Sequence, residues 1–268
     1  MSWITGGPFV MGSDRHYAEE RPAHPVSVDG FWIDRHTVTN AAFAAFVAAT
    51  GYVTLAERPL DPALYPDALP ELAVPGALVF RMTSGPVDTR DLRHWWHYVP
   101  GASWHLPEGP GSDLAGRADH PVVHAAFEDA QAYAAWAGKA LPTEAEWEFA
   151  ADGFAGTAPV ASYEPNGYGL HDMADNVWEW TPDWYAERHP ALADKPCCVP
   201  SNPRGAPVEA SYDPHQPASP IPRKVVKGGS FLCTPSYCRR YRPAARQPQM
   251  IDSAMSHIGF RCVVRGED

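Results

Sequence analysis

The sequence predicts an α+β fold with few long helices or strands. Of the 268 residues, 29 are proline and 21 are glycine, and both residue types interrupt regular secondary structure. Ten tryptophans and eleven tyrosines indicate a core built largely of aromatic side chains. No internal repeat or linker is evident, so we expect residues 1–268 to form one domain with much irregular structure.

The N-terminal region is expected to hold two short strands and a helix. Apolar residues alternate with small or polar ones over residues 6–13 and again over 26–33, as in half-buried strands. Thr39 or Asn40 can cap a helix over residues 41–49, because both side chains accept hydrogen bonds from the first free backbone N–H groups. The buried face of this helix would consist of Phe43, Phe46 and Val47.

The remainder of the chain is expected to be mostly loops, with two further helices. Residues 52–118 are rich in turn residues, and a helix follows over residues 128–137. Thr143 opens another helix, because Glu146 three residues later completes a capping box. Residues 195–223 are rich in proline, serine and asparagine, which indicates a long surface loop.

Charge and hydropathy exclude several classes of partner. The net charge of −11 opposes binding to nucleic acid or to an anionic membrane surface. Basic residues cluster only at 239–242 and Arg246, which leaves room for a local polar substrate site. No apolar run approaches the roughly 20 residues needed to span a bilayer. The first residues lack the features of a signal peptide, so we expect a cytoplasmic protein. We also expect a monomer.

The five cysteines point to thiol chemistry rather than to a disulfide framework. An odd number without a secretion signal leaves at least one thiol unpaired. The adjacent residues Cys197 and Cys198 lie in the long loop and receive no role.

Cys233 and Cys238 are the most informative pair. They are five positions apart, and Pro235 between them favours a bend. A zinc site would need a second pair of ligands at similar spacing, which the sequence does not offer. Two thiolates suit Cu(I), which accepts low coordination numbers, and the arginines nearby would favour the thiolate form. Spacing alone leaves a local disulfide or two buried structural thiols equally open.

Sequence blocks along the chain resemble the formylglycine-generating enzymes of the sulfatase-modifying-factor family. The segment around the cysteine pair reads GGSFLC over 228–233, RYRPAAR over 240–246 and IGFRC over 258–262. Three other blocks match in order, namely GGPFVMGS at 6–13, LPTEAEWEF at 141–149 and NGYGLHDMADNVWEW at 166–180. Most of these blocks mark the wider superfamily, whereas the paired cysteines are specific to the oxidases.

The resemblance implies a fold related to C-type lectins and a defined reaction. Cu(I) would sit between Cys233 and Cys238, and a cysteine in a Cys-X-Pro-X-Arg segment of an unfolded sulfatase would be oxidised by O2 to formylglycine. Trp178, Ser230 and Tyr237 would line the oxygen pocket. Taken singly, these three have ordinary alternatives, as a core residue, a turn residue and a packed aromatic.

The resemblance also implies calcium. Asp172 and Glu179 would bind Ca²⁺ through their side chains, and Asp175 and Val177 through their carbonyls. The alternative is that these acids simply face solvent.

A second calcium site would include Asp152 and the carbonyl of Phe154. Family members usually carry a long insertion at this point, which holds the other half of that site. Either this sequence omits a stretch of chain or the protein has lost the site. Vertebrate relatives have a cysteine where this chain has Ala134, so Cys262 would remain a free buried thiol.

Two other functions remain open at this stage. The iron-dependent sulfoxide synthases share the domain but add a His-rich helical domain, whereas here His94 and His97 form the most closely spaced histidine pair and are expected in a surface loop. A non-catalytic lectin-like binding module would not need the two cysteines.

Overall fold

The computed structural model describes residues 1–66, 68–88, 90–151, 165–174, 176–190, 199–217, 219–233 and 238–266. The helices are α1 (Asn40–Thr50), α2 (Phe127–Trp136) and α3 (Glu144–Ala151). The strands are β1 (Ser2–Ile4), β2 (Gly7–Met11), β3 (His24–Val28), β4 (Phe31–Ile33), β5 (Gly76–Phe80), β6 (Trp96–Pro100), β7 (Trp178–Trp184), β8 (Arg223–Lys227), β9 (Arg246–Met250), β10 (Ile258–Gly259) and β11 (Val263–Arg265). Short 3₁₀ turns lie at Ala18–Glu20, Leu55–Glu57, Pro70–Leu72, Leu92–His94 and Val208–Ser211.

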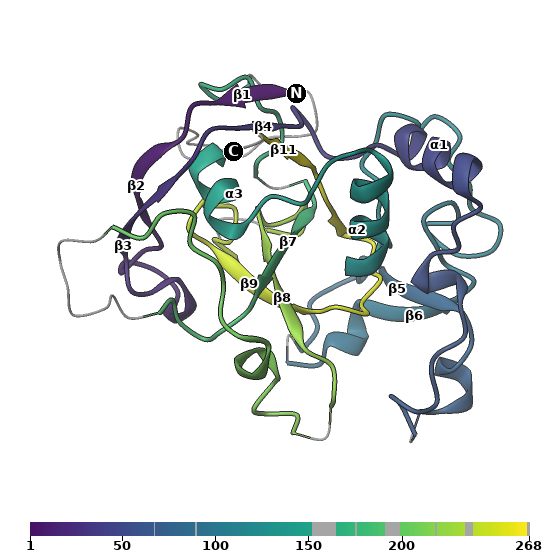
Figure 1. The fold of residues 1–268 in the computed structure, drawn as a ribbon. Helices are drawn as coiled ribbons and strands as arrows, with labels where there is room; N and C mark the ends of the chain where they lie inside the picture. Colours follow the sequence, from purple (N-terminus) through teal and green to yellow (C-terminus); the bar gives the residue numbers. More distant parts are fainter. Residues whose placement is uncertain are drawn as a thin grey trace.

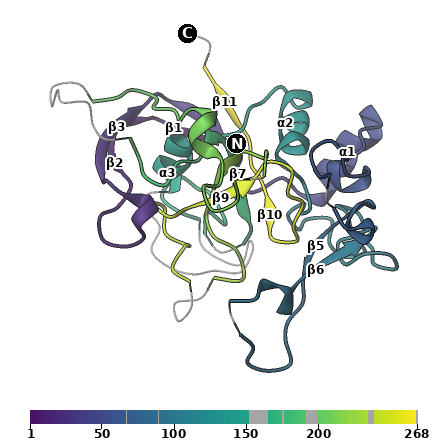
Figure 2. The same cartoon turned by 90° about the horizontal axis from the view of Figure 1, so that it is seen from below.

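The strands form small sheets rather than one large one (Figure 1). The central sheet has the order β10-β7-β8-β9, and β1, β4 and β11 join the two ends of the chain in a second sheet. The pairs β2–β3 and β5–β6 are antiparallel. Figure 2 shows β5 and β6 on the same side of the molecule as α1, away from β2 and β3. The predicted α+β class with little regular structure is confirmed.

Two predictions about strands were incomplete. Residues 26–33 form two strands, β3 and β4, because the chain breaks at Asp29-Gly30. A side chain at Gly30 would meet the Trp3 ring at 2.6 Å, so only glycine lets β1 and β4 pair this closely. Residues 52–118 contain the β5–β6 hairpin as well as loops.

The helix ends follow the predicted capping chemistry. Thr39, not Asn40, caps α1, and its Oγ1 accepts a hydrogen bond from the Ala42 N–H at 3.3 Å. Gly51 ends the helix in the left-handed conformation. At α3, the Thr143 N–H donates to Glu146 and the Glu146 N–H donates back to the Thr143 hydroxyl, which completes the predicted capping box.

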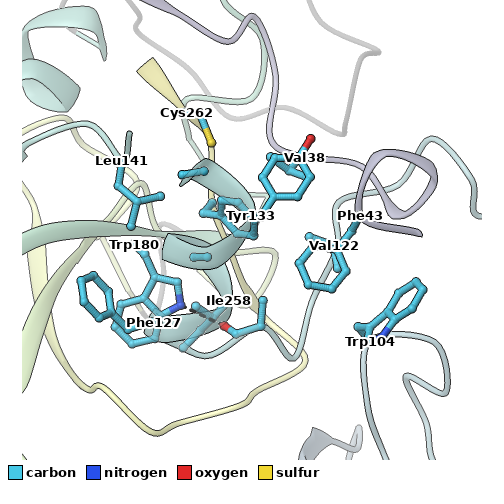
Figure 3. Close-up of a cluster of buried hydrophobic side chains, with 14 of the residues drawn as sticks. Val38, Phe43, Trp104, Val122, Phe127, Tyr133, Leu141, Trp180, Ile258 and Cys262 are labelled. Carbon is cyan, nitrogen blue, oxygen red and sulfur yellow. Dashed lines mark hydrogen bonds between the residues drawn. The ribbon is translucent and has the colours of Figure 1, made fainter. Parts of the chain in front are cut away.

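An aromatic core lies between α1, α2 and the central sheet (Figure 3). Phe43 and Phe46 of α1 are buried against Tyr133 of α2. The indole N–H of Trp180 in β7 donates to the Ala125 carbonyl at 2.9 Å, so this buried ring has its hydrogen bond satisfied (Figure 3). Trp178, two residues earlier on β7, belongs to the same core. The predicted aromatic interior is therefore present.

The described part of the 195–223 loop is attached to the protein. Ser211 is fully buried, and the Arg223 guanidinium donates to its carbonyl at 2.9 Å.

Within the described ranges, no helix combines the length and apolar character needed to cross a bilayer.

Candidate functional site

The structure brings the sulfurs of Cys233 and Cys238 together. They lie 3.1 Å apart, which is longer than the roughly 2.05 Å of a disulfide bond, so the pair is a hydrogen-bonded thiol pair. Both side chains are partly buried. The predicted convergence of the two cysteines is confirmed. Residues 234–237 between them, including Tyr237, lie outside the described residues.

Cys233 is held by a tight turn and by the core. Its N–H donates to the Ser230 carbonyl at 2.8 Å, and the Leu232 N–H donates to the Ser230 hydroxyl at 3.3 Å. The Phe231 N–H donates to the Asn176 carbonyl at 3.0 Å, which ties this turn to the residues before β7. Cys233 packs against the core cluster that includes Trp178. Ser230 is buried in the turn that holds Cys233, and Trp178 is buried in the core cluster against which Cys233 packs.

Cys238 is held instead by the N-terminal segment. The N–H of the next residue, Arg239, donates to the Tyr17 hydroxyl at 3.1 Å. The guanidinium of Arg240 lies 4.3 Å from the Tyr17 ring centroid, and that of Arg242 lies 5.7 Å away. Tyr17 therefore occupies the space between two arginines that follow the cysteine.

Two carboxylates complete this contact. Glu19 pairs with Arg240 at 2.6 Å, and the fully buried Glu20 holds Arg242 through both carboxylate oxygens. The roles of Tyr17, Glu19 and Glu20 were not predicted from the sequence. An acidic pair that precedes an arginine-rich segment by more than 200 positions gives no local signal.

The surroundings of Cys238 favour its thiolate. The hydrogen bond from the Cys233 thiol, the Arg240 N–H and the charges of Arg240 and Arg242 together lower the pKa of Cys238 to about 6, although partial burial opposes the shift. Most free thiols titrate at about 8.5. The thiolate is the form that ligates a metal, so the pair presents the ligand chemistry that a soft metal ion needs.

An aromatic row runs from Phe231, close to Cys233 in the chain, to the buried His257. Phe231, two residues before Cys233, is about half exposed, at 52%. Its ring lies 6.3 Å from Phe80 of β5, and Phe80 packs edge-on against Trp96 of β6. Trp96 in turn lies 4.5 Å from the buried His257 ring. The β5–β6 hairpin, which was expected to be loop, therefore contacts the turn that holds Cys233 through the Phe80–Phe231 ring pair.

The residues expected to bind calcium have other partners. Both carboxylate oxygens of Glu179 accept hydrogen bonds from Arg261 at 2.7 Å, and the Trp147 indole donates to one of them at 2.8 Å. The Asp172 carbonyl accepts from Arg261 at 3.2 Å. In this arrangement Arg261 pairs with both oxygens of Glu179. The calcium site stays a prediction.

Several other predicted residues are not part of the described site. Asp152, Phe154, Asp175, Cys197 and Cys198 lie outside the described residues. Val177 is buried beside Gly259. His94 is exposed and His97 lies on β6, and the described residues contain no group of three or more histidine, cysteine or acidic side chains placed to hold a metal. Cys262 is a buried thiol without a disulfide, as predicted.

Comparison with known proteins identifies the family. The sequence profile of the sulfatase-modifying factor enzyme 1-like domain matches residues 1–157 and 152–266. This chain belongs to that family. A Formylglycine-generating enzyme of Mycobacterium tuberculosis is 48% identical over 97% of this chain and 96% of its own length. An Inactive C-alpha-formylglycine-generating enzyme 2 of Mus musculus is 33% identical over 98% of this chain and 84% of its own length.

A solved structure supports the fold. PvdO from Pseudomonas aeruginosa superposes with a TM-score of 0.61 at 20% identity, covering 97% of this chain and 92% of PvdO. At this identity the likeness concerns the fold alone, and it agrees with the predicted sulfatase-modifying-factor fold.

The comparisons also bear on the segment after Ala151. The two parts of the family match meet at residues 152–157, and the alignment with the M. tuberculosis relative spans 300 positions, more than the 268 residues of this chain. The relative therefore carries residues that this chain lacks, as the sequence analysis expected of the family insertion.

Proposed function

We propose that this protein oxidises a cysteine of a sulfatase polypeptide to Cα-formylglycine. The observation that carries the proposal is the contact of the Cys233 and Cys238 sulfurs at 3.1 Å. Support comes from the 48% identical relative, which is named for this activity. The family also contains a relative named as inactive, so membership alone does not indicate this activity. The thiol pair is the feature that supports it.

Cu(I) is the cofactor that this pair fits. Two sulfur atoms of neighbouring side chains, one of them with a lowered pKa, match the preference of a soft monovalent ion for few thiolate ligands. Among the described residues no third histidine, cysteine or acidic side chain joins the pair, and a substrate thiolate is proposed as the third ligand. When bound, Cu(I) would supply the means of activating O2.

The side chains of this chain would bind and orient the substrate. Cys233 and Cys238 would hold the metal beside the substrate sulfur. Ser230 and Tyr237 are proposed to donate hydrogen bonds to reduced oxygen, and Trp178 to exclude water from that side. Phe231 would contact the substrate chain, because an exposed aromatic ring beside a reactive site offers apolar surface to an extended peptide.

The overall chemistry balances with dioxygen as the oxidant. Two electrons and two protons leave the Cβ–S unit of the substrate cysteine and are accepted by O2. Water then adds to the resulting carbon–sulfur double bond, sulfide leaves, and the aldehyde remains. The proposed substrate is an unfolded sulfatase segment with the sequence Cys-X-Pro-X-Arg, whose arginine suits the acidic net charge of this protein.

Mass spectrometry of a Cys-X-Pro-X-Arg peptide tests the proposal. Protein loaded with one equivalent of Cu(I) is expected to convert the peptide to the aldehyde in air. Cys233→Ser and Cys238→Ser should each abolish conversion and Cu(I) retention, while Cys262→Ala, which removes a fully buried thiol outside the Cys233–Cys238 pair, should preserve both. Unchanged turnover in both serine variants would overturn the copper assignment.

A further inference from the structure

Tyr17 joins the N-terminal segment to the chain that follows Cys238. Its hydroxyl accepts a hydrogen bond from the Arg239 N–H at 3.1 Å, across 222 positions of the sequence. The next backbone N–H, that of Arg240, donates to the Cys238 sulfur. The Tyr17 hydroxyl therefore fixes the stretch of backbone on which the position of that sulfur depends.

Tyr17 is itself held by a short, anchored turn. Its carbonyl accepts from the Glu20 N–H at 3.2 Å, and the Glu20 carbonyl accepts from the Ser13 N–H at 3.0 Å. Glu20 is fully buried and holds Arg242 through both carboxylate oxygens. The hydroxyl of Tyr17 is thus presented to Arg239 from a fixed part of the fold.

Two arginines contact the Tyr17 ring. The guanidinium of Arg240 lies 4.3 Å from the ring centroid and that of Arg242 lies 5.7 Å away, distances at which a cation is attracted to an aromatic face. The Arg242 guanidinium also donates to the Arg239 carbonyl at 2.9 Å. Arg239 is therefore held at both of its backbone polar groups, by Tyr17 at the N–H and by Arg242 at the carbonyl.

The two sulfurs are positioned by different parts of the chain. Cys233 lies in a turn bonded to Ser230 and packs against the core, whereas the segment after Cys238 is bonded to Tyr17. The 3.1 Å contact between the sulfurs needs both segments in place. Two ligands that are already positioned bind a metal ion more tightly than two that must first be ordered, because the ordering entropy is not lost on binding.

We propose that Tyr17 is a positioning residue for the metal-binding pair, which holds the Cys238 sulfur beside that of Cys233 before a metal binds. The inference rests on the proposed function, because that function makes the two cysteines the ligands of Cu(I). Tyr17 acts through the backbone of Arg239 and Arg240 and does not itself contact the metal. A purely structural role would instead lower the stability of the fold and leave the metal affinity of the folded protein unchanged.

Cu(I) affinity tests this role without turnover. Copper-free protein carrying Cys197→Ser and Cys198→Ser, which leaves the proposed pair as the site measured, is titrated without O2 against a chromogenic chelator. Tyr17→Phe keeps the ring and removes the hydroxyl, so the Cu(I) dissociation constant should rise about three- to tenfold, as expected for one neutral hydrogen bond. Tyr17→Ala also removes the ring and should give a larger rise. Tyr212→Phe, at a tyrosine that is 41% exposed, should leave the affinity unchanged.

A dithiol reagent tests the position of the two sulfurs without copper. Phenylarsine oxide binds two neighbouring thiols at once, so the same copper-free protein should take up one equivalent, measured by intact mass spectrometry, and Cys233→Ser should prevent this. In Tyr17→Phe a competing small dithiol should remove the reagent at a lower concentration than in the native protein, whereas Tyr212→Phe should behave as the native protein.

The outcomes separate this inference from the proposed function. The inference is overturned if Tyr17→Phe retains Cu(I) and the arsenical to within about twofold of the native protein, even where its free energy of unfolding falls. Tyr17→Phe decides the matter where Tyr17→Ala does not fold. Failure of the native protein to retain Cu(I) would reject the copper assignment instead, and the arsenical measurement would then decide the role of Tyr17 by itself.

Discussion

Cys238 and Cys262 carry the same thiol in two regions with opposite electrostatics. Cys238 is partly exposed beside Arg240 and Arg242, and its pKa is lowered to about 6. Cys262 is fully buried in the aromatic core, and burial together with the nearby Asp34 carboxylate raises its pKa well above the usual range. The comparison teaches that solvent access and neighbouring charge, not residue type, select which cysteine can serve as a metal ligand.

Arginines lie next to both cysteines in the sequence, but only those after Cys238 lower the pKa of the neighbouring thiol. Arg261, which precedes Cys262, is fully buried and neutralised by Glu179. Arg240 and Arg242 also have acidic partners, Glu19 and Glu20. These two arginines are partly exposed, and their charges also act on the Cys238 thiol. The Arg261 pair therefore stabilises the fold, whereas the arginines after Cys238 also stabilise a thiolate.

The largest expected effect comes from breaking the buried pair. Glu179→Gln leaves the Arg261 guanidinium buried without a counter-charge, and we expect a loss of about 3–5 kcal/mol in the free energy of unfolding. Urea denaturation followed by tryptophan fluorescence measures it.

The matched control for that experiment is Glu108→Gln, which breaks the exposed pair with Arg117. It should change the free energy of unfolding by less than about 1 kcal/mol, because solvent screens this pair. Equal losses in both variants would contradict the assignment of a special structural role to Glu179.

The next largest effect is expected in the rates at which Cys238 and Cys262 are alkylated. In copper-free protein, the rate of iodoacetamide modification of Cys238 should rise as the pH passes through about 6 and level off above it, because the thiolate is the reactive form. Cys262 should remain at least about 100-fold slower at pH 7, since burial both raises its pKa and blocks access. Peptide mapping by mass spectrometry reports each site, and comparable rates at neutral pH would refute the contrast.

The smallest effect is expected from removing the Cys262 sulfur. Cys262→Ala deletes one atom from a packed core, so the free energy of unfolding should fall by about 1 kcal/mol. Cu(I) affinity, measured by competition with a chromogenic chelator, should not change. A tenfold loss of Cu(I) affinity would show that the Cys262 side chain affects metal binding by Cys233 and Cys238.

The sequence by itself determined the local features of this protein. The caps of α1 and α3 each depend on residues within a few positions of one another, and the aromatic character of the core follows from the composition. The family resemblance added the order of the matching blocks and singled out Cys233 and Cys238 as the proposed metal ligands. These features were predictable because hydrogen bonds at helix ends and turns join neighbours in the chain.

Tertiary structure alone decided how the site is supported. Tyr17 and Glu20 reach the arginines after Cys238 across 222 positions, and the Phe231 N–H beside Cys233 donates to the Asn176 carbonyl across 55 positions. Periodicity reports which face of an element is buried, but not which distant segment covers it. Whether a thiol is acidified depends on those distant partners, so the chemistry of the site emerges only when the chain is folded.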